Sequence, residues 1–136
     1  MTRVSVIIPT FNRQDLISNS VDSVMNQTKQ ADEIIVVDDG SVDNTWQILR
    51  EKGFSDSLQN KTALRYIYQK NQGVSAARNF GIKSSRYEYI ALLDSDDHWL
   101  KNKLERQIST LEAKNFPCRI SHTDEIWIRN GVRVNA

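Results

Sequence analysis

The chain has 136 residues, enough for one domain of ordinary size, and its 39% hydrophobic content supports a buried core. A formal net charge of +1 excludes a protein built mainly to neutralise nucleic-acid phosphates, so no nucleic-acid partner is expected. The single cysteine, Cys118, excludes an intrachain disulfide and is expected to be a small buried residue. No apolar run approaches the ~18 residues of a membrane span. We therefore expect a cytoplasmic protein, with attachment to the inner face of the membrane left open.

Strands and helices alternate along the chain. In chain order, the pattern predicts a strand over 4–8, a helix over 16–25, a strand over 33–37, a helix over 46–52, a strand over 64–68, a helix over 72–81, a strand over 88–93 and a helix over 100–111. Asn12 is the expected N-cap of the first helix, and the polar stretch 54–62 is expected to be irregular. The dipeptide Asn130-Gly131 lies between two alternating runs and predicts a β-hairpin.

This alternation predicts an α/β fold in which a mostly parallel sheet is flanked by helices. Polar clusters follow three of the predicted strands, at residues 9–13, 38–41 and 94–97. Right-handed crossovers would bring these strand ends to one edge of the sheet, which is where open α/β sheets bind their ligands.

The acidic run Asp94-Ser95-Asp96-Asp97 directly follows an apolar strand. Anions at such a position repel one another, and burial would raise their pKa values. A hard divalent cation relieves this repulsion, so we expect a Mg²⁺ or Mn²⁺ site that holds a phosphorylated ligand. The alternative is that these acids solvate a loop and cap the next helix.

Two further groups fit recognition of a nucleotide. An ionised carboxylate only accepts hydrogen bonds, so Asp38 and Asp39 can take the N3–H of a uracil or hydrogens of a ribose. The alternative is that Asp39-Gly40 only forms a turn. Arg78 can pair with a phosphate or with an aspartate, the alternative being a charge on the helix surface.

These blocks together resemble the family 2 glycosyltransferases, which have the GT-A fold. The blocks that carry the resemblance are Thr10-Phe11-Asn12-Arg13, Val36-Val37-Asp38-Asp39-Gly40-Ser41, Asn71-Gln72-Gly73 with Ala77-Arg78-Asn79, and Leu93-Asp94-Ser95-Asp96-Asp97 with Trp99 and Lys103-Leu104-Glu105. The match runs in order from about Val4 to Gln107, with Lys101 standing where many members have proline.

The resemblance implies one nucleotide-sugar-binding domain over residues 1–136 and a hexosyltransferase activity of the kind used in polysaccharide biosynthesis. It implies a UDP-sugar donor by default, transfer with inversion, and a sugar, lipid or protein acceptor that the sequence does not name. The residues expected at the nucleotide are Pro9, Thr10, Asn12, Arg13, Asp38, Asp39, Gly73, Arg78, Asp94 and Ser95.

By the same resemblance, Asp94-Ser95-Asp96 is the D-x-D motif. Asp96 is expected to hold the cation and Asp94 to contact the ribose or the cation. For Asp97 two roles remain open: it supports the metal, or it caps the next helix.

Members of the family usually carry the catalytic base in a later segment, and this chain ends at Ala136. Asp124 is the available candidate, the alternative being an acidic pair, Asp124-Glu125, that merely precedes the hairpin. We therefore expect the donor-binding portion of an enzyme, truncated before the segment that carries the base and the acceptor site. The alternative function is a non-catalytic nucleotide-sugar-binding fragment or assembly module, and a homodimer would cover exposed sheet edges.

Overall fold

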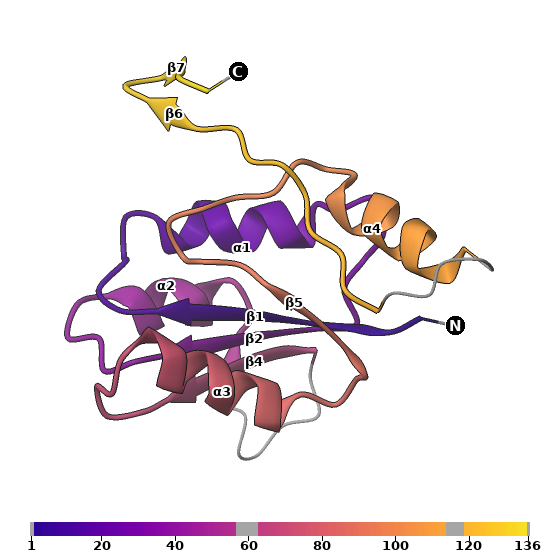
Figure 1. The fold of residues 1–136 in the computed structure, drawn as a ribbon. Coiled ribbons are helices and arrows are strands. Elements are labelled where there is room, and N and C mark those ends of the chain that lie inside the picture. Colours follow the sequence, from indigo (N-terminus) through magenta and orange to yellow (C-terminus); the bar gives the residue numbers. More distant parts are fainter. Residues whose placement is uncertain (1, 57–62, 114–118, 136) are drawn as a thin grey trace.

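The computed structural model describes residues 2–56, 63–113 and 119–135, so Cys118 lies outside the described residues. Strands of the main sheet pair in parallel in the order β3-β4-β2-β1-β5 (Figure 1). These strands are β1 (Val4–Thr10), β2 (Glu33–Asp38), β3 (Ser55–Asp56), β4 (Leu64–Tyr68) and β5 (Tyr89–Leu92). The helices are α1 (Ile17–Met25), α2 (Thr45–Glu51), α3 (Val74–Ser84) and α4 (Lys103–Glu112). The hairpin consists of β6 (Ile128–Arg129) and β7 (Val132–Arg133).

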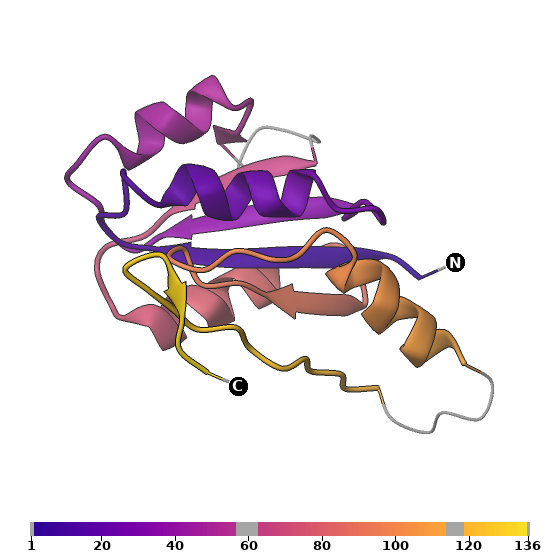
Figure 2. The same cartoon turned by 90° about the horizontal axis from the view of Figure 1, so that it is seen from above.

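Helices cover both faces of the sheet, with α1 on one face and α3 on the other (Figures 1 and 2). Every residue of β1 and β2 is buried, because these central strands have neighbours at both edges and helices on both faces. Alternate residues of β1 enter different cores: Val6 and Ile8 pack in the cluster with α1, α2 and α4, whereas Ile7 packs with Ala77 of α3. The expected α/β fold with a mostly parallel sheet is confirmed.

Two local expectations differ from the structure, and a third, the hairpin, is confirmed. Asn12 does not cap α1: the helix begins at Ile17 after a turn, and the Asn12 side chain accepts a hydrogen bond from the Val42 N–H at 2.9 Å instead. Ser55–Asp56 is a short strand rather than irregular, because it pairs with β4 at the sheet edge. The predicted hairpin is present but its ladder joins only residues 128–129 to 132–133, and it projects away from the sheet (Figure 1).

None of the helices in the described ranges has the length and the apolar character needed to span a bilayer.

Gly81 sets the distance between α3 and the sheet. A Cβ built on this glycine would collide with Cγ2 of Ile7 and lie 3.1 Å from Cγ2 of Val37. Gly81→Ala is therefore expected to destabilise the fold by about 1–3 kcal/mol through overpacking, although alanine is the better helix former. Urea unfolding measures this change, and a variant as stable as the parent would show that the helix moves off the sheet without cost.

Candidate functional site

The ends of β1, β2 and β5 form one polar rim, because these strands are parallel neighbours. Thr10 at the end of β1 is in register with Asp38 at the end of β2, and the Asp39 N–H donates to the Thr10 carbonyl at 2.8 Å. On the other side of β1, the Leu93 N–H donates to the Ile7 carbonyl at 3.0 Å. The clusters expected at residues 9–13, 38–41 and 94–97 therefore meet at this rim.

Two arginines connect the acidic run to other elements of the rim. Arg78 of α3 donates from Nη2 to Oδ1 of Asp94 at 2.6 Å. Arg13, in the loop after β1, places Nη2 4.0 Å from Oδ2 of Asp96. Each of these side chains keeps between 33% and 50% of its surface exposed, so the ion pairs remain accessible to a ligand. Arg78 therefore pairs with an aspartate and is not merely a charge on the helix surface.

Asp39 is the most heavily hydrogen-bonded acid of the rim, although it is only 4% exposed. Its Oδ1 accepts from the Gln69 side chain at 2.7 Å and from the Gln72 N–H at 2.8 Å. Its Oδ2 accepts from the Gly73 N–H at 3.0 Å and from the Asn71 side chain at 3.3 Å. Asp39 thus holds the loop that leads into α3 in place. Its role is therefore larger than the local turn that was the alternative for Asp39-Gly40.

Asp38, which precedes Asp39, is also buried, and it holds the loop after β2 in place. Its Oδ2 accepts from the Tyr66 hydroxyl at 2.6 Å, and its Oδ1 accepts from the Ser41 N–H at 2.8 Å. The Tyr66 ring lies 4.2 Å from that of Trp46, centroid to centroid, which holds the phenol in place. These contacts fit the supporting role expected of Asp38.

The loops after β1 and β2 are also tied to each other. The Asn12 N–H donates to the Ser41 hydroxyl at 2.8 Å, in addition to the contact between the Asn12 side chain and Val42. Asn12 has a left-handed backbone, with φ of 50°, which asparagine tolerates better than most residues. Within the described ranges, the Thr10 hydroxyl is buried and has no hydrogen-bond partner. It is therefore a polar atom at the rim that a ligand could satisfy.

The acidic run itself brings three carboxylates together. Asp94, Asp96 and Asp97 each offer an oxygen, and these oxygens lie within 4.8 Å of one another. Burial raises the pKa of Asp97, and the negative charges of Asp96, Asp94 and Glu125 raise it further. Asp97 does not cap the next helix, because α4 begins after Asn102. The carboxylates therefore repel one another, which is the electrostatic situation that a bound cation relieves.

Ser20 of α1 holds the acidic run from beneath, and it was not identified from the sequence. Its buried hydroxyl lies 2.8 Å from the Ser95 carbonyl and also contacts the Asp97 carbonyl. In the sequence it was only a small residue on the apolar face of a predicted helix, and its partners lie 75 and 77 residues away.

Ser20→Ala is expected to destabilise the fold by about 1–3 kcal/mol, because the Ser95 and Asp97 carbonyls lose the one hydroxyl donor that they share. Urea unfolding gives this free energy. Ser23→Ala is the matched control, because the Ser23 hydroxyl donates to the Ser20 carbonyl one turn back in the same helix, at 2.7 Å, and not to the acidic run. Equal losses from both substitutions would show that the contact with the acidic run contributes nothing.

The segment over residues 121–123, which follows α4 in the chain, is hydrogen-bonded to that helix. Gln107 donates from Nε2 to the Ser121 carbonyl at 3.1 Å, and Lys103 lies 3.2 Å from the Thr123 hydroxyl. The Lys103 ammonium also lies 5.3 Å from the centre of the Trp99 ring, and burial lowers its pKa. These contacts bring the following pair, Asp124-Glu125, toward the acids.

Of that pair, Glu125 is the residue that interacts with the acidic run. Its charge raises the pKa of Asp97, and its Oε2 accepts from the Trp127 indole at 2.7 Å. Asp124 remains a prediction as the catalytic base.

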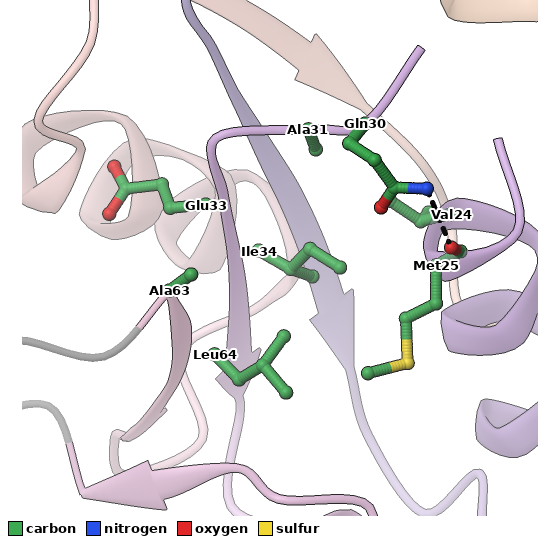
Figure 3. Close-up of a pocket in the computed structure, with 8 residues that line it drawn as sticks. All are labelled: Val24, Met25, Gln30, Ala31, Glu33, Ile34, Ala63 and Leu64. Atoms are coloured by element: carbon green, nitrogen blue, oxygen red, sulfur yellow. Dashed lines mark hydrogen bonds between the residues drawn. The ribbon is translucent and has the colours of Figure 1, made fainter. Parts of the chain in front are cut away.

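A pocket of about 260 Å³ lies at the opposite edge of the sheet (Figure 3). It is lined by Val24, Met25, Gln30, Ala31, Glu33, Ile34, Ala63 and Leu64. The Glu33 carboxylate points away from Met25 and Ile34, and Ser5 and Arg65 occupy its oxygens (Figure 3). The pocket therefore offers mainly apolar surface and none of the rim acids.

A parallel sheet flanked by helices, with acidic clusters at its carboxyl rim, fits the expected GT-A nucleotide-diphospho-sugar transferase fold, and the solved structures that superpose on this chain confirm it. The sequence matches the model of glycosyl transferase family 2 over residues 5–132, and the chain belongs to this family. It is 42% identical over 114 residues to the Escherichia coli UDP-Glc:alpha-D-GlcNAc-diphosphoundecaprenol beta-1,3-glucosyltransferase WfgD, an alignment that covers 83% of this chain and 42% of WfgD. It spans only 16% of an uncharacterized Rickettsia bellii glycosyltransferase to which it is 41% identical over 89% of its own length. The chain thus covers less than half of either relative.

Solved structures share the fold. Staphylococcus aureus TarS 1-349 in complex with UDP-GlcNAc superposes with a TM-score of 0.69 at 30% identity, over 81% of this chain and 31% of TarS 1-349. The mannosyltransferase PcManGT from Pyrobaculum calidifontis, in complex with GDP-Man and Mn²⁺, gives a TM-score of 0.66 at 25% identity, over 82% of this chain and 33% of that chain.

Proposed function

We propose that this chain is the donor-binding portion of a glycosyltransferase that uses a UDP-sugar. The observation that carries the proposal is the convergence of Asp39 with the acids Asp94, Asp96 and Asp97 on one rim. The names of two similar proteins support the choice of nucleotide, since WfgD uses UDP-Glc and TarS 1-349 was solved with UDP-GlcNAc.

The donor would lie across the rim. The base would meet Asp39, near Pro9, Thr10 and Asn12, and the ribose would meet Asp94. Arg13 and Arg78 each lie beside one of the acids, so both could turn to the diphosphate and neutralise it. Gly73 and Ser95 would line the same rim, where the Gly73 N–H donates to Asp39 and the Ser95 carbonyl accepts from Ser20.

The residues of the acidic run fit a divalent cation. Carboxylate oxygens are the ligands that Mg²⁺ and Mn²⁺ prefer. Burial and then the neighbouring negative charges raise the pKa of Asp97, and the repulsion among the three carboxylates favours a positive charge between them. Asp96 and Asp94 would hold the cation and Asp97 would support it. When bound, the cation supplies Lewis-acid stabilisation of the diphosphate leaving group. PcManGT, which was solved with Mn²⁺, supports this assignment.

Transfer would proceed with inversion, since one acceptor hydroxyl attacks opposite the diphosphate and a carboxylate takes its proton. Asp124 is the candidate base within this chain. The WfgD name specifies a lipid diphosphate acceptor, so we place the activity in the cytoplasm, with the acceptor at the inner face of the membrane.

The test is a calorimetric titration with UDP, GDP and dTDP, each with and without Mn²⁺. We expect UDP to bind most tightly and Mn²⁺ to strengthen its binding. If none of the three nucleotides binds, the proposed function is wrong. A sugar-transfer assay on this chain and on a longer reading frame then separates an enzyme from a non-catalytic binding module, because a module binds UDP without transferring the sugar.

A further inference from the structure

Hydrogen bonds restrict the backbone on both sides of Asp96 and Asp97. A peptide unit is planar, so a bond to its N–H or its C=O restricts the orientation of the whole unit. The Asp97 N–H donates to the Asp94 carbonyl at 3.1 Å, which restricts the unit between Asp96 and Asp97. The carbonyls of Ser95 and Asp97 both contact the Ser20 hydroxyl. Since these carbonyls belong to the units before Asp96 and after Asp97, three consecutive peptide units of the acidic run are held.

Ser20 is a rigid support for these units. Its side chain is fully buried in α1, and Ser95, which it holds, is only 6% exposed. Seven residues further along the chain, Gln27 donates from Nε2 to the Leu100 carbonyl at 2.7 Å and accepts from the Leu104 N–H at 3.0 Å. The helix and the residues that directly follow it therefore hold this stretch of chain at both of its ends.

This support opposes a repulsion within the acidic run. The three carboxylates of the run offer oxygens within 4.8 Å of one another, and like charges at such distances repel. The ion pairs with Arg13 and Arg78 are partly exposed to solvent, so they offset this repulsion only weakly. The Ser20 hydroxyl contacts backbone carbonyls and no carboxylate. It thus holds the run from its buried side and leaves the carboxylate oxygens available to a ligand.

On the basis of the proposed function, we infer that Ser20 is a positioning residue for the cation, because it holds the backbone of Asp96 and Asp97 in one arrangement before the cation binds. Mg²⁺ requires near-ideal octahedral geometry, whereas Ca²⁺ accepts irregular coordination. An arrangement that is set in advance therefore favours the smaller ion. Ser20 determines in this way both the affinity of the acidic run for the cation and its preference for Mg²⁺ over Ca²⁺.

The experiment titrates the full chain with UDP by calorimetry, over a series of Mg²⁺ concentrations and over a matching series of Ca²⁺ concentrations. The quantity compared is the cation concentration that gives half of the effect on UDP binding. Ser20→Ala is expected to raise this concentration about 10-fold for Mg²⁺, the lower end of the effects known for outer partners of metal ligands. The value for Ca²⁺ should rise less, and UDP binding without a cation should be unchanged.

Two further variants control this result. Ser23→Ala removes a hydroxyl that donates to the Ser20 carbonyl within α1, and it should leave the responses to both cations at the values of the parent. Ser20→Cys keeps a small side chain at this position but replaces the hydroxyl with a weak donor. It should also weaken the response to Mg²⁺ more than the response to Ca²⁺, and it provides the test if the alanine variant does not fold.

The outcomes separate the inference from the proposed function. An equal loss of the responses to Mg²⁺ and Ca²⁺, or weaker UDP binding in the absence of a cation, would give Ser20 a merely structural role and overturn the inference. Unchanged responses in both Ser20 variants would overturn it as well. If the parent binds UDP without responding to either cation, the inference is wrong and donor binding stands. If the parent binds no nucleotide, both are wrong.

Discussion

Glu33→Ala is expected to destabilise the fold by about 3–5 kcal/mol, because it leaves a buried arginine without its carboxylate. Glu33 begins β2 and its side chain is fully buried. Its Oε2 accepts from Nη1 of Arg65 at 3.0 Å, and its Oε1 accepts from the Ser5 hydroxyl and from the Arg86 N–H, both at 2.6 Å. Nη1 of Arg65 would keep its bond to the Ser84 carbonyl at 2.7 Å, but this neutral acceptor does not balance the charge of the guanidinium. Nε of Arg65 already has no partner among the described residues.

Urea unfolding of three variants tests this expectation. Glu88→Ala is the matched control, because Glu88 forms a pair with Arg119 that is slightly shorter, at 2.8 Å, but both side chains are more than 70% exposed. That substitution is expected to cost less than about 1 kcal/mol. The double variant Glu33→Leu/Arg65→Met removes both charges and is expected to recover most of the loss. If Glu33→Ala costs no more than Glu88→Ala, the buried pair does not stabilise the sheet.

The fold was accessible from the sequence because its signals are local. The apolar runs 4–8 and 33–37 are too continuous for a sheet that is wetted on one face, and both strands are buried throughout. Once the strands are known to be parallel, their carboxyl ends must lie at the same edge of the sheet. The meeting of Asp39 and Asp96 at one rim follows from that rule alone.

The contacts within the rim were not accessible, because their partners are distant in sequence. Glu33 appeared to be a charge at the start of a strand, and its partners lie 28, 32 and 53 residues away. Asn12 satisfied the local rule for a helix cap, but the loop after β2 offers it hydrogen bonds and the helix begins elsewhere. For Asp39, the sequence showed a free acceptor, whereas the folded chain surrounds it with donors.

The second large effect is expected at the acidic run, where three carboxylates lie close together. Asp96→Asn is expected to weaken Mn²⁺ binding by at least about 10- to 100-fold, since even the outer partners of metal ligands have effects of that size. The fold should be unaffected, because Asp96 is half exposed and the cation beside it, Arg13, lies 4.0 Å away in an equally exposed pair. UDP titrations over a series of Mn²⁺ concentrations measure the effect: Mn²⁺ should strengthen UDP binding to the parent and leave the variant nearly unchanged.

Two controls give this result its meaning. Glu112→Gln removes an exposed carboxylate from the end of α4 and should leave the response to Mn²⁺ intact. Asp97→Asn removes a carboxylate whose raised pKa shows that its charge is opposed by burial and by its neighbours. Its loss relieves repulsion while it removes a supporting ligand, so its effect on Mn²⁺ should be smaller than that of Asp96→Asn. If Asp97→Asn is instead the more damaging variant, then Asp97 rather than Asp96 is the principal ligand. If neither variant changes the response to Mn²⁺, the cation binds elsewhere.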